Sequence, residues 1–139
     1  MMAQSFKAQV AAWVAKSERR LEAVFKESTQ RLVSQVIDRT PVDTGYLRAS
    51  LQVTLDGPLP IRPDGRGMVG ENYRPPDYAL KIAGAELGDT IYASFVASYA
   101  AHVEYGARGR SGRGMVRLSV QSWQQIVDGV VRDVQMRIR

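Results

Sequence analysis

Apolar residues in the first third of the chain recur at steps of three and four positions, and charged residues occupy the other positions. The apolar set is Phe6, Val10, Trp13, Val14, Leu21, Val24, Phe25, Leu32, Val33, Val36 and Ile37. This period predicts an amphipathic helix over about residues 6–39. Such a helix would be about 51 Å long, which is more than the width of a globular body of this size. Two interpretations stay open: the whole stripe faces the core, or one end packs on a neighbouring subunit.

The helix should end at the segment Thr40-Pro41-Val42-Asp43-Thr44-Gly45. Pro41 lacks an amide hydrogen and disfavours a helical conformation at Thr40. Asp43 and Thr44 can each offer a side-chain oxygen to nearby backbone amides, and Gly45 tolerates a positive φ. The segment is therefore predicted to be a structural corner.

Beyond the corner, apolar residues alternate with polar ones from Tyr46 to Leu55, starting with Leu47, which predicts a half-buried strand. An alternative is a helical turn capped by Thr44, with the strand beginning near Leu51. Residues 56–77 hold five of the six prolines and four of the twelve glycines. We expect this Pro/Gly-rich loop to be extended and to become ordered against a partner.

The remaining chain is predicted to form a hairpin, a short helix, a basic loop and a long helix. Tyr78, Leu80 and Ile82 indicate a second strand, and residues 90–96 a third, with a turn at 84–89. The stretch 99–105 has the composition of two helical turns that end at Gly106. Residues 106–117 form a basic loop, and apolar residues recur at helical spacing from about Met115 onward.

The predicted fold is therefore α+β, with a long N-terminal helix and a C-terminal helix packed on a small antiparallel β-sheet with long loops. At 139 residues, the simplest organisation is one domain over residues 1–139.

Composition adds a modest positive charge and excludes some chemistry. There are 19 Lys+Arg against 14 Asp+Glu, giving a net charge of +5, and no cysteine. Disulfides and thiolate zinc sites are therefore excluded. No apolar run approaches the roughly 20 residues that span a bilayer. We expect a protein without a membrane partner, made in a cytoplasm.

The sequence contains no residue pattern typical of a catalytic or cofactor-binding site. The glycines of residues 106–114 lack the lysine of a phosphate-binding loop. His102 and Glu104 are two positions apart, so a helix would point them to different sides. Asp43-Thr44-Gly45 matches the Asp-Thr-Gly triplet of aspartic proteases. The predicted helix before it and Tyr46 after it differ from the residues that surround the triplet in those enzymes. We therefore expect no enzyme activity, no cofactor and no metal.

Two motifs, one after the other along the chain, resemble those of a known family. The first is Thr40-Pro41-Val42-Asp43-Thr44-Gly45-Tyr46-Leu47-Arg48-Ala49-Ser50, and the second is Tyr99-Ala100-Ala101-His102-Val103-Glu104-Tyr105-Gly106. Together they resemble the gene-product-ten-type tail-component family of long-tailed double-stranded DNA bacteriophages, over about residues 6–135. Tyr46 stands where that family often has a basic residue, and Arg-Gly repeats replace a Pro-aromatic segment after Gly106.

The resemblance implies a structural virion protein of the phage neck, acting in head–tail connection or tail completion. It implies a homo-oligomeric ring between portal and tail tube, with a hexamer favoured over a dodecamer. Other neck and tail proteins, such as a connector or stopper and a tail terminator, would be its partners. The expected location is the virion, after synthesis in the bacterial host cytoplasm.

A nucleic-acid-binding module is the alternative function. The segment 106–117 holds four arginines and no acidic residue, and these arginines could contact packaged DNA or a protein partner. They are Arg108, Arg110, Arg113 and Arg117.

Overall fold

The computed structural model describes residues 5–42, 45–67, 73–74 and 77–139. Its helices are α1 (Phe6–Arg39), α2 (Tyr46–Ala49), α3 (Tyr78–Ala83), α4 (Ala100–Tyr105), α5 (Met115–Gln121) and α6 (Trp123–Arg137). Its strands are β1 (Leu51–Thr54), β2 (Tyr92–Phe95), β3 (Gly106–Ala107) and β4 (Arg110–Ser111). The predicted α+β class is confirmed, with a long N-terminal helix, a C-terminal helix and small antiparallel sheets.

The long helix α1 begins and ends where the sequence predicts. At its start the Ser5 Oγ accepts a hydrogen bond from the Ala8 amide at 3.1 Å, which caps the first turn. At its end Thr40 has an extended backbone, with φ −74° and ψ 123°. Pro41 imposes this conformation on the residue before it. The Thr40 hydroxyl donates to the Val36 carbonyl at 2.6 Å, so it satisfies a carbonyl of the last turn.

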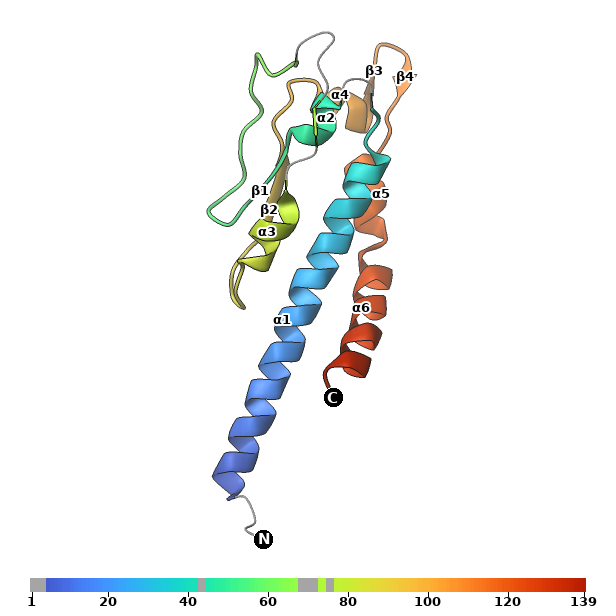
Figure 1. The fold of residues 1–139 in the computed structure, drawn as a ribbon. Coiled ribbons are helices and arrows are strands. Elements are labelled where there is room, and N and C mark those ends of the chain that lie inside the picture. The colour runs from blue at the N-terminus through green and yellow to red at the C-terminus, as the bar shows by residue number, and fades with distance from the viewer. Residues whose placement is uncertain (1–4, 43–44, 68–72, 75–76) are drawn as a thin grey trace.

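Helix α1 is the central element of the fold, with other elements packed on two of its sides. It contacts α5, α6 and α3, and α3 also contacts β1. Figure 1 shows α5 and α6 on one side of α1, and α3 with the β1–β2 sheet on the other. Strands β1 and β2 pair antiparallel from Leu51↔Phe95 to Thr54↔Tyr92. The secondary elements therefore form layers on two sides of one helix.

The predicted hairpin over residues 78–96 is wrong. Residues 78–83 form the helix α3, and β2 pairs with β1. In α3 Ile82 is fully buried whereas Leu80 is 71% exposed, so the alternate apolar residues do not share a buried face. Three alternating positions in a short segment are too few to separate a strand from a helix. Contact with α1 and β1 decides the outcome.

Two other predicted elements are refined. The strand after the corner begins at Leu51 and follows the helix α2, as in the alternative interpretation. The C-terminal helix is interrupted at Ser122, whose amide donates to the Ser119 carbonyl at 3.0 Å, and so divides into α5 and α6. Both α5 and α6 contact α1.

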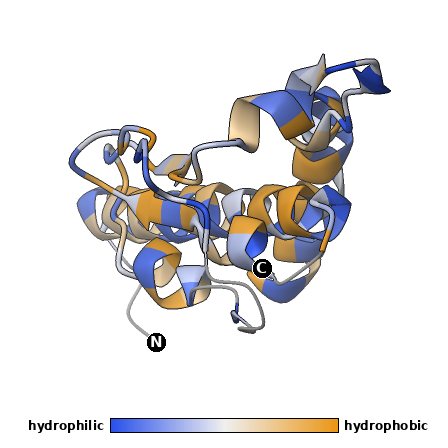
Figure 2. Ribbon diagram, turned by 90° about the horizontal axis from the view of Figure 1, so that it is seen from above, coloured by the Kyte–Doolittle hydropathy of each residue, from blue (hydrophilic) through white to orange (hydrophobic). Residues whose placement is uncertain are grey.

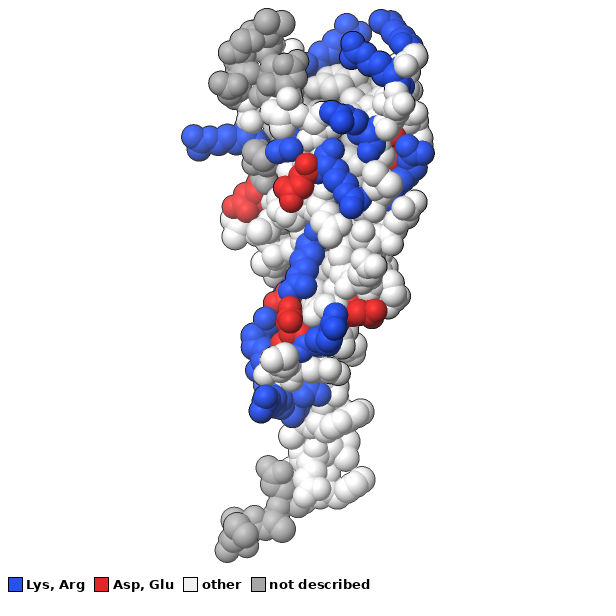
Figure 3. Space-filling view, turned by 90° about the vertical axis from the view of Figure 1, so that its right-hand side faces the viewer, with Lys and Arg blue, Asp and Glu red and all other residues white. Residues whose placement is uncertain are grey.

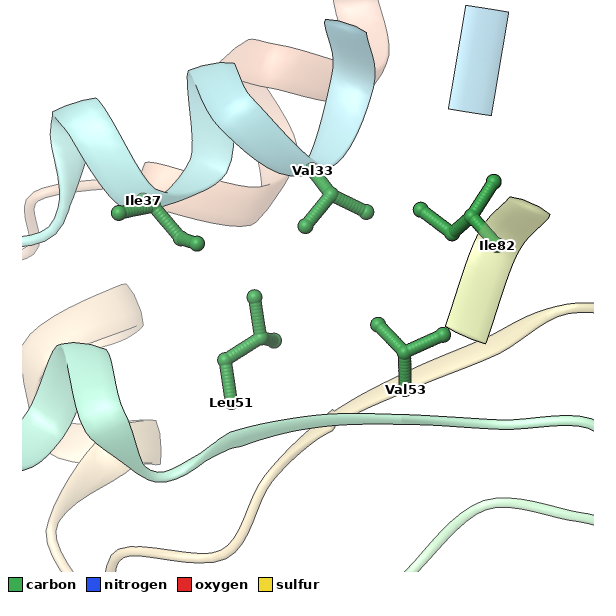
Figure 4. Packing of buried hydrophobic residues seen from close by; sticks show 5 residues of the cluster. All are labelled: Val33, Ile37, Leu51, Val53 and Ile82. Atoms are coloured by element: carbon green, nitrogen blue, oxygen red, sulfur yellow. The ribbon is translucent and has the colours of Figure 1, made fainter. Parts of the chain in front are cut away.

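The main hydrophobic core lies between α1, β1 and α3. Figure 4 shows Val33 and Ile37 of α1 facing Leu51 and Val53 of β1, with Ile82 of α3 closing the side. A separate cluster forms where α6 packs on α1. Its buried members are Ile126, Val130 and Val134. Figure 2 shows hydrophobic and hydrophilic residues alternating around the helices, as expected of amphipathic helices that bury one face.

Two ion pairs join α6 to α1. Arg31 pairs with Asp133 and Glu27 with Arg137, both at 2.7 Å. The Arg20 Nε also donates to the Ile138 carbonyl at 2.7 Å. Exposed pairs of this kind contribute only about 0–1 kcal/mol each, so they orient the helices more than they stabilise them. None of the helices in the described part of the chain is both long and apolar enough to span a bilayer.

Candidate functional site

The corner after α1 depends on a glycine. Gly45 has φ +87°, a conformation that residues with a Cβ rarely adopt. A Cβ at this position would also lie 2.6 Å from the Tyr73 carbonyl oxygen. The corner thus uses the positive φ that Gly45 was expected to tolerate, and close packing of Tyr73 adds a second reason for glycine. The capping roles predicted for Asp43 and Thr44 lie outside the described residues.

Arg48 closes the corner, a role that was not assigned from the sequence. Its Nε donates to the Thr40 carbonyl at 2.8 Å and its Nη2 to the Asp38 carbonyl at 3.3 Å. A cation at the last carbonyls of a helix satisfies them and interacts favourably with the helix dipole. The buried Ser50 hydroxyl donates to the Leu47 carbonyl at 2.7 Å and ends the helix α2. The sequence signal that could have indicated this role of Arg48 is an arginine three residues after the corner glycine.

The second motif is built around the buried carboxylate of Glu104, which is 5% exposed. Its Oε2 accepts from the Val116 amide at 2.9 Å, and its Oε1 from the Arg117 amide at 3.0 Å. The Arg117 Nε also donates to Oε1 at 3.0 Å. Burial raises the pKa of Glu104, but the two amides and the guanidinium outweigh it and hold this pKa below its ordinary value. Glu104 therefore joins α4 to the start of α5.

Arg117 differs from the other three arginines of the basic segment. Its guanidinium pairs with Glu104, donates to the Glu104 carbonyl at 2.7 Å and lies 4.8 Å from the centre of the Tyr105 ring. These contacts give Arg117 an intramolecular role that its place in the basic segment does not predict. Within the described residues, the side chains of Arg108, Arg110 and Arg113 make no ion pair.

The predicted basic loop is in fact a short hairpin that leads into α5. Strands β3 and β4 pair through Gly106↔Ser111 and Ala107↔Arg110. The two turn residues, Arg108 and Gly109, have φ values of +52° and +78°. Positive φ at both central residues suits the right-handed twist of a two-residue hairpin, although an arginine rarely occupies the first of them. This turn places Arg108 at the tip of the hairpin.

Glycines tie this hairpin to the helix before it. A Cβ on Gly112 would collide with the carbonyl oxygen of Glu104, near the end of α4. The Arg113 amide donates to the Val103 carbonyl at 2.7 Å, and the Gly114 amide donates to the Glu104 carbonyl at 3.1 Å. The glycines therefore permit close backbone contact between the hairpin and α4.

The two sequence motifs meet in one cluster. Leu47 from the corner motif packs with Ala100 from the second motif, and Met115 of α5 completes the contact. Tyr46, Tyr99 and Val103 lie against the same buried group. The two motifs, about fifty residues apart in sequence, thus form one structural unit at the end of the molecule opposite the N-terminus (Figure 1).

The described part of the Pro/Gly-rich loop packs on this unit. The Arg62 amide donates to the Val96 carbonyl at 2.9 Å, and the Ser98 amide donates to the Gly65 carbonyl at 2.8 Å. The Leu59 amide donates to the Ser94 hydroxyl at 3.1 Å. No helix or strand occurs in residues 56–67, as predicted. The expectation that the loop needs a partner to become ordered does not hold for residues 59–65, because they bond to the domain itself.

An open groove of about 1400 Å³ lies between the corner, this loop and the hairpin, and we call it the basic groove. Its cationic and imidazole side chains are Arg66, His102, Arg108, Arg110 and Arg113. Its apolar side chains include Pro41, Val42, Leu47, Ile61, Pro63 and Val103. Among the described residues that line the groove, none is acidic. Figure 3 shows Lys and Arg gathered at the end of the molecule that carries β3 and β4.

The N-terminal half of α1 presents a different surface, which we call the free stripe. It consists of Phe6, Val10, Trp13, Val14 and Leu21. Trp13 is 68% exposed and Phe6 is 81% exposed, and every residue from 5 to 15 is exposed. Figure 1 shows this half of α1 extending beyond the rest of the fold, and Figure 3 shows a long uncharged surface near its end. The free stripe is the apolar face that the fold leaves uncovered.

The described residues contain no group of three or more His, Cys, Asp or Glu placed to hold a metal ion. His102 is exposed and Glu104 is buried, so the two side chains face different environments, as their spacing predicts. Comparisons of the chain with protein-family models, curated proteins and solved structures found no match.

Proposed function

We propose that this protein is a structural component of the phage neck that assembles into a homo-oligomeric ring by means of the free stripe. The observation that carries the proposal is the exposure of the N-terminal half of α1. Contiguous exposed apolar surface of this kind marks an interaction site in soluble proteins, whereas single exposed apolar residues are ordinary. A helix that extends past its own domain can reach a neighbouring subunit.

Ring assembly requires a contact between two different surfaces of the same chain. The free stripe is one such surface. Apolar side chains on α5 and at the start of α6 offer another, since Leu118 is 46% and Val120 is 52% exposed, with Trp123 close by. A head-to-tail contact between the two surfaces forms a ring when the rotation from one subunit to the next closes, and we propose such a ring, with a hexamer favoured over a dodecamer. The neck assignment itself rests on the two motifs, which the fold unites around Leu47 and Ala100.

Assembly can be tested by placing acids on the free stripe. The variant with Phe6→Glu and Trp13→Glu should remain monomeric in light scattering and in negative-stain microscopy, where the wild-type protein forms rings. The matched control is Ala8→Glu with Ala15→Glu, which adds the same charge on the opposite side of the helix by its spacing. Rings that survive the first pair of changes, or a wild-type protein that stays monomeric at high concentration, would refute assembly through the free stripe.

The position in the virion needs a separate test. Electron microscopy of intact particles, with this chain labelled, should place it between the portal and the tail tube. Its partners would be the connector or stopper and the tail terminator on either side. Particles that lack the chain, or that carry it elsewhere, would contradict the neck assignment whatever the isolated protein does in solution.

Nucleic-acid binding is the second candidate, and three arginines on the hairpin support it. Arg108, Arg110 and Arg113 are free of ion pairs in the described part of the chain, whereas Arg117 is held by Glu104. Three or four phosphate contacts would give a log–log salt slope of about −3 to −4 for duplex DNA. Binding without this slope would exclude phosphate neutralisation as its basis.

A further inference from the structure

We propose that the basic groove binds an acidic peptide segment of a partner protein, with apolar side chains of that segment resting on the groove floor. This inference goes beyond ring assembly and does not depend on the neck assignment. It rests on the groove's charge, on its apolar floor and on the conformation that presents the arginines.

Charge sets the first requirement on the ligand. Arginines enter the groove from two separate segments, since Arg66 lies on the Pro/Gly-rich loop while Arg108 and Arg110 lie on the hairpin. The described lining provides no carboxylate to neutralise them. A ligand that carries several negative charges would therefore supply the ion-pair partners that these arginines lack among the described residues.

The apolar floor sets the second requirement. The groove is lined by the apolar side chains of Val42, Ile61 and Pro63, which we call the apolar floor; Val42 is 58% and Ile61 is 46% exposed, so both are accessible to a ligand. A phosphate backbone would gain nothing from these side chains and would leave them in water. A peptide with alternating acidic and apolar residues can place carboxylates on the arginines and apolar groups on the floor at the same time. The floor therefore favours an acidic peptide over a nucleic acid.

Backbone conformation supports a binding role for the hairpin. Arg108 has φ +52°, although asparagine or glycine would fit this turn position with less strain. Contacts from Arg113 and Gly114 to α4 hold the hairpin beside the groove. The strained turn thus presents a long cationic side chain at the tip of a hairpin that is fixed at its base.

Binding can be measured by the fluorescence anisotropy of three labelled probes on the full chain. The first is a short peptide in which Glu and Asp alternate with Leu and Phe. The second has the same charges with Ser in place of Leu and Phe, and the third is a DNA duplex of similar charge. The proposal requires that the first probe bind at least about tenfold more tightly than the second, because only the first can use the apolar floor.

Two sets of variants locate the site. Changing Arg108, Arg110 and Arg113 together to Ser should weaken binding of the first probe at least about tenfold, as loss of charge-assisted contacts predicts. Changing Val42 and Ile61 to Ser should remove its advantage over the second probe. The control changes Lys7, Arg19 and Arg132 to Ser, which removes the same charge from exposed positions on α1 and α6. Thermal melting checks that each variant is folded.

Several outcomes would overturn the proposal. Equal binding of the two peptides, or no effect of the floor variant, would leave only nonspecific attraction to polyanions. Tighter binding of DNA than of the first peptide, dependent on the arginines alone, would assign the groove to nucleic acid. Absence of binding to all three probes would also refute it. None of these results bears on ring formation, which is measured without any ligand.

Discussion

The two ends of α1 have the same apolar period but different surroundings. The C-terminal end, which we call the motif end, packs through Val33 and Ile37 on the core and continues into the corner and the second motif. The other end presents the free stripe, with Phe6 and Trp13 exposed. Periodicity therefore establishes which face of a helix is apolar, but not what covers that face. At the motif end the cover is the chain's own sheet, and at the free end we propose a second copy.

The largest contrast should come from truncating one aliphatic side chain at each end. Ile37→Ala should lower the free energy of unfolding by about 2–5 kcal/mol, because it leaves a cavity in the core. Leu21→Ala, at a residue that is 60% exposed, should change it by no more than about 0.5 kcal/mol. Urea unfolding at a protein concentration low enough to keep both variants monomeric measures the difference. Similar losses at the two sites would mean that the free stripe is covered within the monomer.

The corner at the motif end should be sensitive to any side chain at Gly45. Gly45→Ala should cost about 2–3 kcal/mol, because the new Cβ has an unfavourable φ and collides with the Tyr73 carbonyl. Gly88→Ala is the matched control: its φ is +95°, but no atom lies within 4 Å of the added Cβ. Its cost should be about 1–2 kcal/mol, from the backbone alone. Equal melting temperatures for the two variants would show that Tyr73 does not restrict the corner.

A smaller effect, visible in the pH dependence, should come from Glu104. Its folded-state pKa lies below the value in the unfolded chain, so its contribution to stability is present above the unfolded pKa of about 4.5. This contribution is lost as the pH falls through the lower folded pKa. Glu104→Gln should cost about 1–3 kcal/mol near neutral pH, and it should reduce the loss of stability on acidification.

Urea unfolding of the wild-type and Glu104→Gln proteins at about pH 7 and about pH 3 tests this expectation. Glu18→Gln serves as the control, because Glu18 is exposed on the free half of α1. A pH dependence that is the same in all three proteins would show that Glu104 does not link α4 to α5 through its ionised form.

Much of this fold follows from local rules that the sequence displays. The bounds of α1 follow from its long apolar period, from Ser5 as a cap and from Pro41 as a stop. The α4 helix ends at Gly106 because the glycine adopts φ +95°. These features depend on residues close in sequence, so backbone preferences and spacing suffice to predict them.

Contacts between distant segments decided the rest. Residues 78–83 form a helix because Ile82 packs against α1 and β1, and β2 pairs with β1 although a long loop and α3 separate the two strands in sequence. The pairing of Arg117 with Glu104 and the assembly of the basic groove from three segments also depend on the folded chain. Sequence patterns reveal residue types and periods, whereas burial and charge pairing depend on which distant groups the fold brings within a few ångströms.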